Sequence, residues 1–252
     1  MASRRNRPRY SAAELLNMAL FTPLLWPGRT VRLERNSLLD YRNRSTSAQV
    51  SVAELYHENS KLSSELLPEL IGTSVDPAEL REEFFTRRAA LAGAGGGDQF
   101  DGIGVWKELL HPVAERGGPA LFYAIELRLV AGNILAEYQP AGRSFHVLKH
   151  LDEQDRGRLV SSLSLVAGDG LQGDESLIFL LACFPRNEIL LGQRGYRRTL
   201  IEAGQIAEEV LCSAAHAGRE SRIYYEFADR DVDLIMEVDG VEQSTVIAIA
   251  CR

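Results

Sequence analysis

Three arginines that could grip a phosphate stand close together in the chain, at Arg194, Arg197 and Arg198. They lie at the predicted start of a long helix, which follows an apolar run over residues 176–184. A guanidinium can bind a phosphate through two parallel hydrogen bonds, and the N–H groups at a helix start strengthen the attraction. The pattern therefore predicts an anion-binding helix start. A surface helix with a basic first turn fits the same residues.

The predicted helix within residues 192–218 also carries an apolar stripe that suits burial against a core or a second subunit. Gly204 and the alanines would let another backbone come close. The stripe consists of Leu200, Ala203, Ile206, Ala207, Val210, Leu211 and Ala214.

A glycine run over residues 93–97 suggests a phosphate loop, but its context argues against one. A dinucleotide fingerprint follows a strand and opens a helix, whereas this run follows a predicted helix and precedes no Lys-Ser or Lys-Thr pair. The sequence also has no Gly-x-Ser-x-Gly elbow and no cysteine beside a potential base. We interpret the run as a linker or lid, and we find little support for hydrolase or acyl-transfer chemistry.

Two groups of potential metal ligands have the wrong spacing. The acidic segment 229–233 begins like a calcium loop, but Leu234 occupies the position that requires glycine. His146 and His150 are spaced i,i+4 without a Glu-x-x-His context. The sequence therefore predicts no metal site.

Composition and charge narrow the function classes. The chain has 252 residues, of which 45% are hydrophobic and 25% charged, so a sizeable core is expected. Its formal net charge of −7 argues against a nucleic-acid binder, because such proteins are usually basic. Three cysteines without paired spacing fit a reducing cytoplasm, and we interpret Cys183 and Cys212 as small core residues.

The basic N-terminal stretch superficially resembles an export signal. Its arginines precede an apolar segment, but Glu14 and Asn17 interrupt that segment and Pro23 breaks it. No apolar run is long enough to span a bilayer, so we expect a cytoplasmic protein without membrane association. Residues 1–45 are expected to form a basic arm that is either solvated or docked on a partner, and residues 46–252 a single domain.

Helices and strands that would position these groups are interleaved along the chain, which predicts an α+β fold with a mixed sheet flanked by helices. Helices are expected over 11–21, from Val50 and from Asp76, which would cap the third one. The elements expected after these are a strand over 119–132, a strand from Asn133, a helix from Phe145 with a break at Gly157, a strand over 176–184, the long helix, a strand over 223–227, a short helix from Asp229 and a strand over 244–250.

From Leu190 the chain reads L-L-G-Q-R-G-Y-R-R-T-L-I-E-A-G-Q. This segment resembles the SagB/ThcOx-type branch of the nitroreductase-like flavoproteins, which typically carries K-Y-G-x-R-x-Y-R before an E-A-G-H helix. Three more segments resemble the family in the same order, at residues 56–62, 117–148 and 231–250. The resemblance covers roughly residues 50–252.

The resemblance implies an FMN-binding α+β fold and an intertwined homo- or heterodimer with flavin at the interface. It implies that thiazolines and oxazolines of a ribosomally made peptide are oxidised to thiazoles and oxazoles, as in antibiotic biosynthesis. A base would take a ring proton while a hydride passes to the flavin, which oxygen then reoxidises. A second nitroreductase-like subunit, a cyclodehydratase and a precursor peptide are the partners this implies.

Several family residues survive in this chain and form the candidate flavin site. Arg87 and Arg88 are the nearest remnant of the family's N-terminal phosphate motif, and Arg198 adjoins the surviving arginines. The matching residues are Arg194, Tyr196, Arg197, Glu202 and Gly204.

The departures from the family pattern bear on catalysis. Leu190 and Leu191 stand at the family's Lys-Tyr pair, Ala120 at its serine and Gln205 at its histidine, and segment 222–227 is bulkier than the family's glycine-rich loop. Neither leucine can move a proton, and losing a positioned base typically costs about 10²–10⁴-fold in rate.

Three hypotheses therefore stay open. The first is an FMN-dependent azoline dehydrogenase that could use residues of a partner subunit. The second is a catalytically degenerate subunit that serves an active homologue or a cyclodehydratase as a structural or substrate-binding partner. The third is a flavin reductase of another substrate, for which the Lys-Tyr pair is unnecessary.

Overall fold

The computed structural model describes residues 76–91, 103–117, 119–167 and 175–252, and every structural statement below concerns these residues. The expected arm over 1–45, the helices over 11–21 and from Val50, and the glycine run over 93–97 lie outside them.

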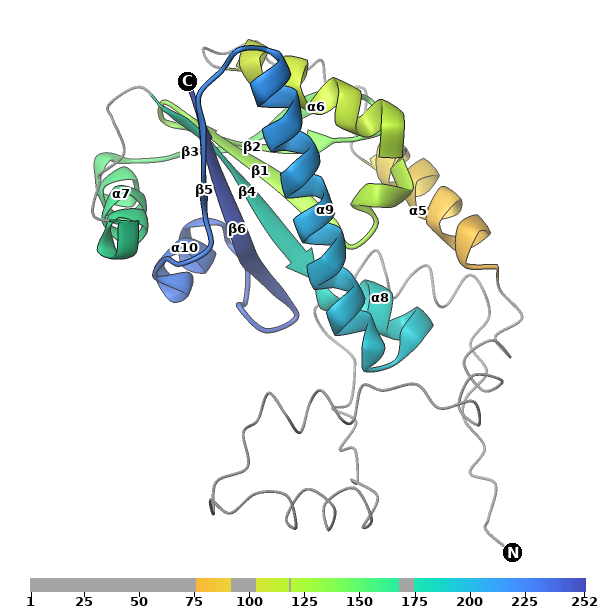
Figure 1. The fold of residues 1–252 in the computed structure, drawn as a ribbon. Helices are drawn as coiled ribbons and strands as arrows, with labels where there is room; N and C mark the ends of the chain where they lie inside the picture. Colours follow the sequence, from red (N-terminus) through yellow and green to blue (C-terminus); the bar gives the residue numbers. More distant parts are fainter. Residues whose placement is uncertain (1–75, 92–102, 118, 168–174) are drawn as a thin grey trace, which may run out of the picture.

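A six-stranded sheet occupies the centre of the fold, in the order β3-β2-β1-β4-β6-β5 (Figure 1). The strands are β1 Ile125–Ala131, β2 Ile134–Gln139, β3 Ser144–His150, β4 Ser176–Cys183, β5 Ser221–Tyr224 and β6 Gln243–Cys251. All five strand pairings among the described residues are antiparallel. The α+β class is thus confirmed, but the described sheet is antiparallel where we expected a mixed one.

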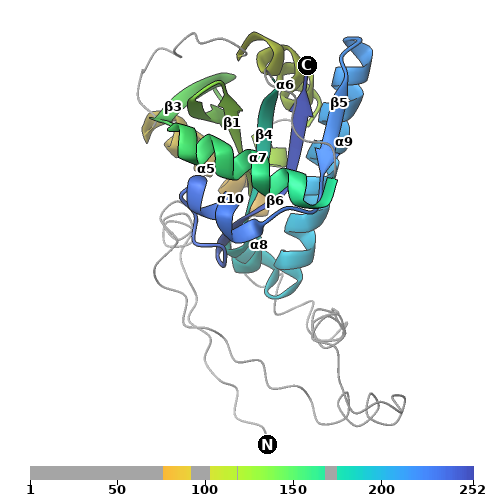
Figure 2. The ribbon, with the colours of Figure 1, turned by 90° about the vertical axis from the view of Figure 1, so that its left-hand side faces the viewer.

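Helices cover both faces of this sheet. The helical elements are α5 Pro77–Leu91, α6 Ile103–Gly117, the 3-10 helix η1 Pro119–Phe122, α7 Glu153–Ala167, α8 Phe184–Leu191, α9 Arg194–His216 and α10 Asp229–Ile235. Figures 1 and 2 show α6 and α9 on one face and α7 and α10 on the other.

Strand β4 shows why its sequence is apolar without alternation. Ile178 and Leu180 belong to the core beneath α6 and α9, whereas Phe179 and Leu181 belong to the core beneath α7 and α10. A strand that is buried on both faces has no solvent side on which polar residues would be favoured. The expected buried strand over 176–184 is confirmed.

Long-range pairing overrides the expected helix from Phe145. Residues Ser144–His150 form edge strand β3, in which Phe145 pairs with Tyr138 of β2, and α7 starts only at Glu153. Asp152 marks that start, because its Oδ1 accepts a hydrogen bond from the N–H of Asp155 at 2.7 Å. The expected break at Gly157 does not occur.

Two helices without a predicted counterpart, α6 and α8, complete the fold. The α6 residue Trp106 is fully buried, and its indole Nε1 donates a hydrogen bond to Ser176 Oγ at 2.6 Å. This bond ties α6 to the first residue of β4. No helix among the described residues is long and apolar enough to cross a membrane.

The three cysteines differ in burial. Cys183 and Cys251 are buried, whereas Cys212 is exposed on α9, so the expectation of a core position for Cys212 is wrong. Its position explains this, because Cys212 lies off the stripe by which α9 contacts the sheet. Burial raises the pKa of the Cys183 thiol to about 12.

We expect the exposed Cys212 thiol to react quickly when the native protein is titrated with an aromatic disulfide reagent. Cys183 and Cys251 should react only after unfolding, because the thiolate is the nucleophile and both thiols are enclosed. The unsubstituted protein should show three reactive thiols in denaturant. The native Cys212→Ser variant should show none. Fast native reaction of Cys183 would contradict the placement of this strand end.

Candidate functional site

The polar side chains gather where β4 passes into α8 and α9. Gly192, at φ +58°, separates the two helices and its N–H donates to Glu188 O at 2.8 Å. A Cβ atom on Gly195 would lie 2.3 Å from Glu188 N and 2.4 Å from the carbonyl carbon of Asn187. Only glycine therefore allows α9 to start in contact with the backbone of α8.

The start of α9 presents the predicted arginines side by side. Arg194 is exposed and makes no hydrogen bond or ion pair with any described residue. Arg197 is half-buried, and the Tyr196 ring stacks on Phe184 with the ring centroids 4.5 Å apart. No side chain caps the helix at Gln193. Such a helix start attracts anions.

Glu202 joins three helices from a buried position, with 2% of its surface exposed. Its carboxylate accepts hydrogen bonds from Asn187 Nδ2 of α8 and Arg198 Nε of α9, each at 2.7 Å. Arg81 NH2 of α5 lies 3.9 Å from the same carboxylate. Asn187 Nδ2 also donates to Thr199 Oγ1 at 3.0 Å. Arg198 is thus already engaged with Glu202.

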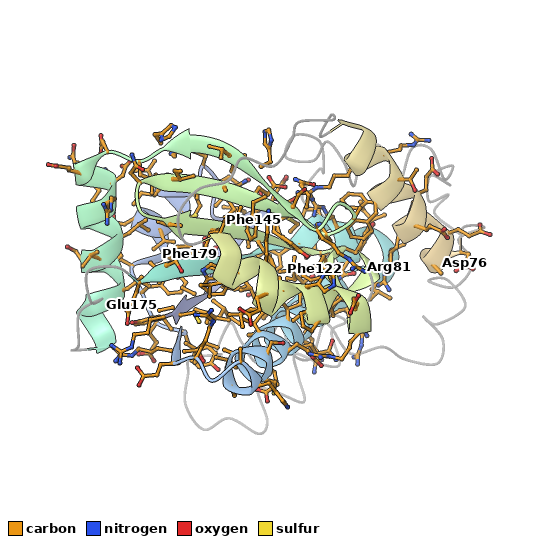
Figure 3. All side chains as sticks on the ribbon, turned by 90° about the horizontal axis from the view of Figure 1, so that it is seen from above. Asp76, Arg81, Phe122, Phe145, Glu175 and Phe179 are labelled. Carbon is orange, nitrogen blue, oxygen red and sulfur yellow. The ribbon has the colours of Figure 1, made fainter. Side chains whose placement is uncertain are left out.

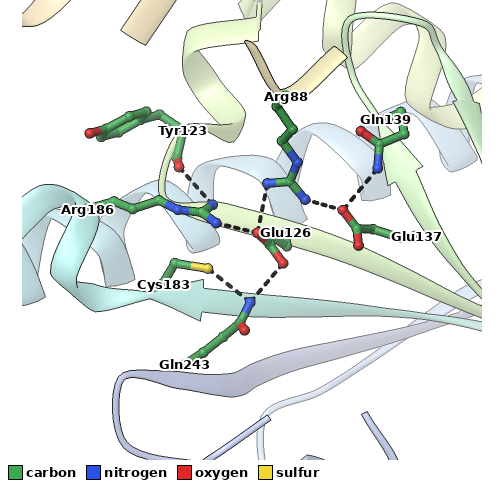
Figure 4. Close-up of polar contacts among 8 residues, drawn as sticks. All are labelled: Arg88, Tyr123, Glu126, Glu137, Gln139, Cys183, Arg186 and Gln243. Atoms are coloured by element: carbon green, nitrogen blue, oxygen red, sulfur yellow. Dashed lines mark hydrogen bonds and ion pairs between the residues drawn. The ribbon is translucent and has the colours of Figure 1, made fainter. Parts of the chain in front are cut away.

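Glu126 of β1 is the centre of a second buried cluster, drawn in Figure 4. Arg88 NH1 lies 2.7 Å from Glu126 Oε1, and Arg186 NH2 contacts the same oxygen. Gln243 Nε2 donates to Glu126 Oε2 at 2.8 Å. Burial alone would raise the pKa of Glu126, but the charges of Arg88 and Arg186 hold that pKa well below its ordinary value.

Arg88 is bound on both sides in this cluster, because its NH2 also contacts Glu137 of β2. Gln139 Nε2 donates to the same Glu137 oxygen at 3.0 Å. Arg87, by contrast, is exposed and pairs with Glu83 one turn earlier at 2.8 Å. Arg88 is therefore held by Glu126 and Glu137, and Arg87 by a residue of its own helix.

One face of helix α5 contributes an arginine to the Glu202 cluster and another to the Glu126 cluster. Arg81 and Arg88 are seven residues apart on this face, with Phe84 between them, so they point the same way. The guanidinium of Arg186 lies 4.8 Å from the centroid of the Phe84 ring, and that of Arg81 lies 5.5 Å from the Tyr123 centroid. Figure 3 shows Asp76 at the outer end of α5 and Arg81 nearer the sheet.

Three enclosed polar atoms around Glu202 have no hydrogen-bond partner: Tyr123 Oη, Asn187 Oδ1 and Arg81 Nε. Burial raises the pKa of Tyr123 to about 12, although Arg186 and Arg81 oppose the shift. Tyr123 therefore keeps its proton at neutral pH, and its hydroxyl can donate a hydrogen bond.

The leucines at the end of α8 offer no acid or base. Leu190 is 7% exposed and belongs to the core, and Leu191 is half-buried beside it. Glu188 lies on the same helix, and burial followed by the charge of Glu242 raises the pKa of its carboxyl.

Gly204 is the candidate residue farthest along α9. It faces outward, and an added Cβ would meet no atom within 4 Å. The expected stripe of α9 is mostly confirmed, since Ala203, Ile206, Ala207, Val210 and Ala214 are buried while Leu200 is 39% exposed.

The described residues contain no group of three or more side chains that could hold a metal ion. His146 and His150 are exposed on β3. Asp233 instead binds the chain itself, accepting hydrogen bonds from Ser244 Oγ at 2.9 Å and Thr245 N at 2.7 Å.

Sequence reasoning identified Glu202 and the α9 arginines but missed Glu126, Glu137, Arg186 and Gln243. A glutamate inside a strand that is apolar apart from Arg128 was the available signal for Glu126, because a buried charge requires a partner. The identity of that partner could not be read from the strand.

No protein-family model matches the sequence, and no curated protein matches it. Among solved structures, the chain is similar to a candidate nitroreductase from Anabaena variabilis, with 17% identity and a TM-score of 0.54 over 81% of this chain and 46% of that one. A candidate nitroreductase from Ralstonia eutropha shows 16% identity and a TM-score of 0.47 over 62% and 75% of the two chains. The third structure is a chain of the E. coli microcin synthetase McbBCD complex with truncated pro-MccB17 bound. It shows 18% identity and a TM-score of 0.46, over 98% of this chain and 84% of that one.

The similarity to the Anabaena structure shows that this chain has a nitroreductase-like fold, as its sequence resemblance predicted. The chain spans about half the length of that protein, since 46% of it is covered.

Proposed function

We propose that this protein is an FMN-dependent oxidoreductase that oxidises azoline rings to azoles in a ribosomally made peptide, in the cytoplasm and beside a cyclodehydratase. The nitroreductase-like fold and the sequence resemblance support this function. The observation that carries it is the uncapped start of α9, where Arg194 is exposed and makes no ion pair with a described residue. An anionic cofactor would be attracted to the positive end of this helix and to Arg194.

The residues present fit FMN at this helix start. Arg194, Arg197 and the first-turn N–H groups would hold the phosphate, with Tyr196 fixed beside them by its stacking on Phe184. FMN, when bound, supplies a two-electron acceptor for the substrate. Arg88 and Arg198 are already paired with glutamates, so we propose that neither binds phosphate and that Arg198, through Glu202, holds the wall of the site.

A second nitroreductase-like subunit would pack on the outer face of α9. Ile201 is 57% exposed and Leu200 39% exposed there, and Gly204 leaves room for another backbone. A homodimer or heterodimer through this face would bring residues of the partner toward the site that Leu190 and Leu191 leave without a base.

Replacing both Arg194 and Arg197 with alanine should weaken flavin retention, because the phosphate would lose its charged donors. We expect at least a tenfold loss of affinity for added FMN, equivalent to about 1.4 kcal/mol. The measurement is flavin absorbance of the purified protein, alone and with its partner, followed by titration with FMN.

Arg230→Ala is the matched control, because Arg230 is also an exposed helix-start arginine but lies on α10. It should retain flavin like the unsubstituted protein. If the double variant also does, the α9 arginines are ordinary surface residues. A protein that takes up no FMN even with partner present rules out the proposed cofactor.

A catalytically degenerate subunit that supports an active partner is the second candidate, favoured by Leu190 and Leu191. The two positions call for different tests, because Leu190 is in the core and a lysine there would bury a charge. Leu191→Tyr alone should fold, and the double variant with Leu190→Lys tests whether activity was lost at this point. No gain of azoline oxidation by either folded variant would direct attention to segment 222–227.

A further inference from the structure

Arg128, in the middle of β1, is buried and makes no ion pair with a described residue. It is 9% exposed, and its Nε is enclosed without a hydrogen-bond acceptor. Among the described residues no hydrogen bond or ion pair to Arg128 exists. Enclosing a guanidinium Nε without an acceptor is costly, so an anion that accepts a hydrogen bond from this guanidinium would stabilise it.

The neighbours of Arg128 on the sheet do not neutralise it. Across the strands it stands opposite Glu137 on one side and Phe179 on the other, and Glu137 in turn stands opposite His146. The Glu137 carboxylate contacts Arg88 and Gln139. Phe179 is apolar, and His146 is exposed on the edge strand and adds no negative charge.

The local charge count shows what is missing. Three guanidinium groups (Arg88, Arg128 and Arg186) are collected around two carboxylates, Glu126 and Glu137. One positive charge is therefore left over, and it belongs to the arginine that has no ion pair. A single monovalent anion would balance the cluster, whereas a dianion would exceed it.

We infer that Arg128 anchors a binding site for a carboxylate group, on the sheet face opposite α9. A carboxylate carries one charge and can accept two parallel hydrogen bonds from one guanidinium. The face is distinct from the proposed flavin site, because Arg128 shares it with Phe179 of the core beneath α7 and α10 (Figure 2), whereas α9 packs on the other face. A free organic acid and the terminal carboxylate of a peptide share this chemistry.

The test follows the arginine Nε–Hε signals of the full ¹⁵N-labelled chain by nuclear magnetic resonance during titration with sodium acetate at constant ionic strength. Arg128→Lys assigns the Arg128 signal by its loss. We expect a saturable shift of this signal with acetate and none with chloride. A short peptide with a free C-terminus, compared with its amide, distinguishes the two sources. The inference is overturned if the Arg128 signal does not shift with any carboxylate, or if it shifts equally with chloride.

A stability measurement decides the question independently of the spectrum. Arg128→Met removes the unpaired charge at similar volume, so the thermal midpoint in chloride buffer should rise and acetate should raise it no further. In the unsubstituted protein acetate should raise the midpoint. A variant that is still stabilised by acetate as strongly as the unsubstituted protein would show that the anion binds elsewhere. Neither measurement requires flavin, so their outcome is separate from that of the proposed function.

Discussion

Gly195→Ala is expected to destabilise the protein by roughly 2–4 kcal/mol, the upper range for overpacking a tight contact. The added Cβ would lie 2.3 Å from Glu188 N and 2.5 Å from Glu188 Cα. These are backbone atoms of α8, which cannot rotate away as a side chain does. The helix crossing itself must open, so the arginines of α9 would also move. Chemical denaturation followed by circular dichroism measures the loss.

Gly157→Ala is the matched control, because Gly157 lies within α7 and an added Cβ there would meet nothing within 4 Å. Alanine is the better helix former, so this variant should gain about 0.5–1 kcal/mol of stability. Gly204→Ala should do the same in the isolated chain, since its site is equally open. A Gly195→Ala variant as stable as these two would contradict the close crossing of α8 and α9.

Glu126→Gln should destabilise the protein at pH 7 by about 3 kcal/mol or more, as expected when one member of a buried ion pair is removed. Arg88 and Arg186 would keep their charges with one carboxylate fewer between them. The exposed pair of Glu83 and Arg87 provides the control: Glu83→Gln should cost no more than about 0.5 kcal/mol. Adding Arg186→Met to Glu126→Gln should recover part of the loss, which a double-mutant cycle measures.

The difference in stability between the unsubstituted protein and Glu126→Gln should depend on pH, because the pKa of Glu126 is lowered. In the unfolded chain a glutamate titrates near about 4.3. Because the folded pKa lies below that value, the carboxylate stabilises the protein fully above the unfolded pKa. This contribution is lost as the pH falls through the folded pKa. The gap between the unsubstituted protein and Glu126→Gln should thus be constant from pH 7 to 5 and shrink below pH 4. A gap that widens on acidification would contradict the cluster.

Local signals in the sequence predicted several elements well. Asp76 was expected to cap a helix, and its Oδ1 accepts a hydrogen bond from Ala78 N at 2.8 Å. The apolar run that forms β4 and the stripe that forms α9 were likewise legible, because burial on two faces or on one stripe determines which residue types are tolerated there. The short helix α10 begins at Asp229 as expected.

Elements that depend on contacts with distant parts of the chain could not be predicted from the sequence. A helix was expected from Phe145, yet residues 144–150 form a strand because β2 offers them backbone hydrogen-bond partners. Helix α8 was hidden between a strand and a longer helix, and its contact with Gly195 appears only when the two backbones meet. Propensity is a weak guide when tertiary contacts compete with it.

The sequence likewise predicted some features of the candidate site, and only the tertiary structure showed the others. The sequence alone determined that arginines stand at the start of a long helix, that Glu202 follows them and that two leucines precede them. Only the tertiary structure decided how the arginines differ: Arg88 and Arg198 are bound to buried glutamates, whereas Arg194 is exposed. The reason is that residue types along a chain report burial, whereas charge pairing depends on groups brought together by folding, as when Glu126 meets Arg186 across 60 residues.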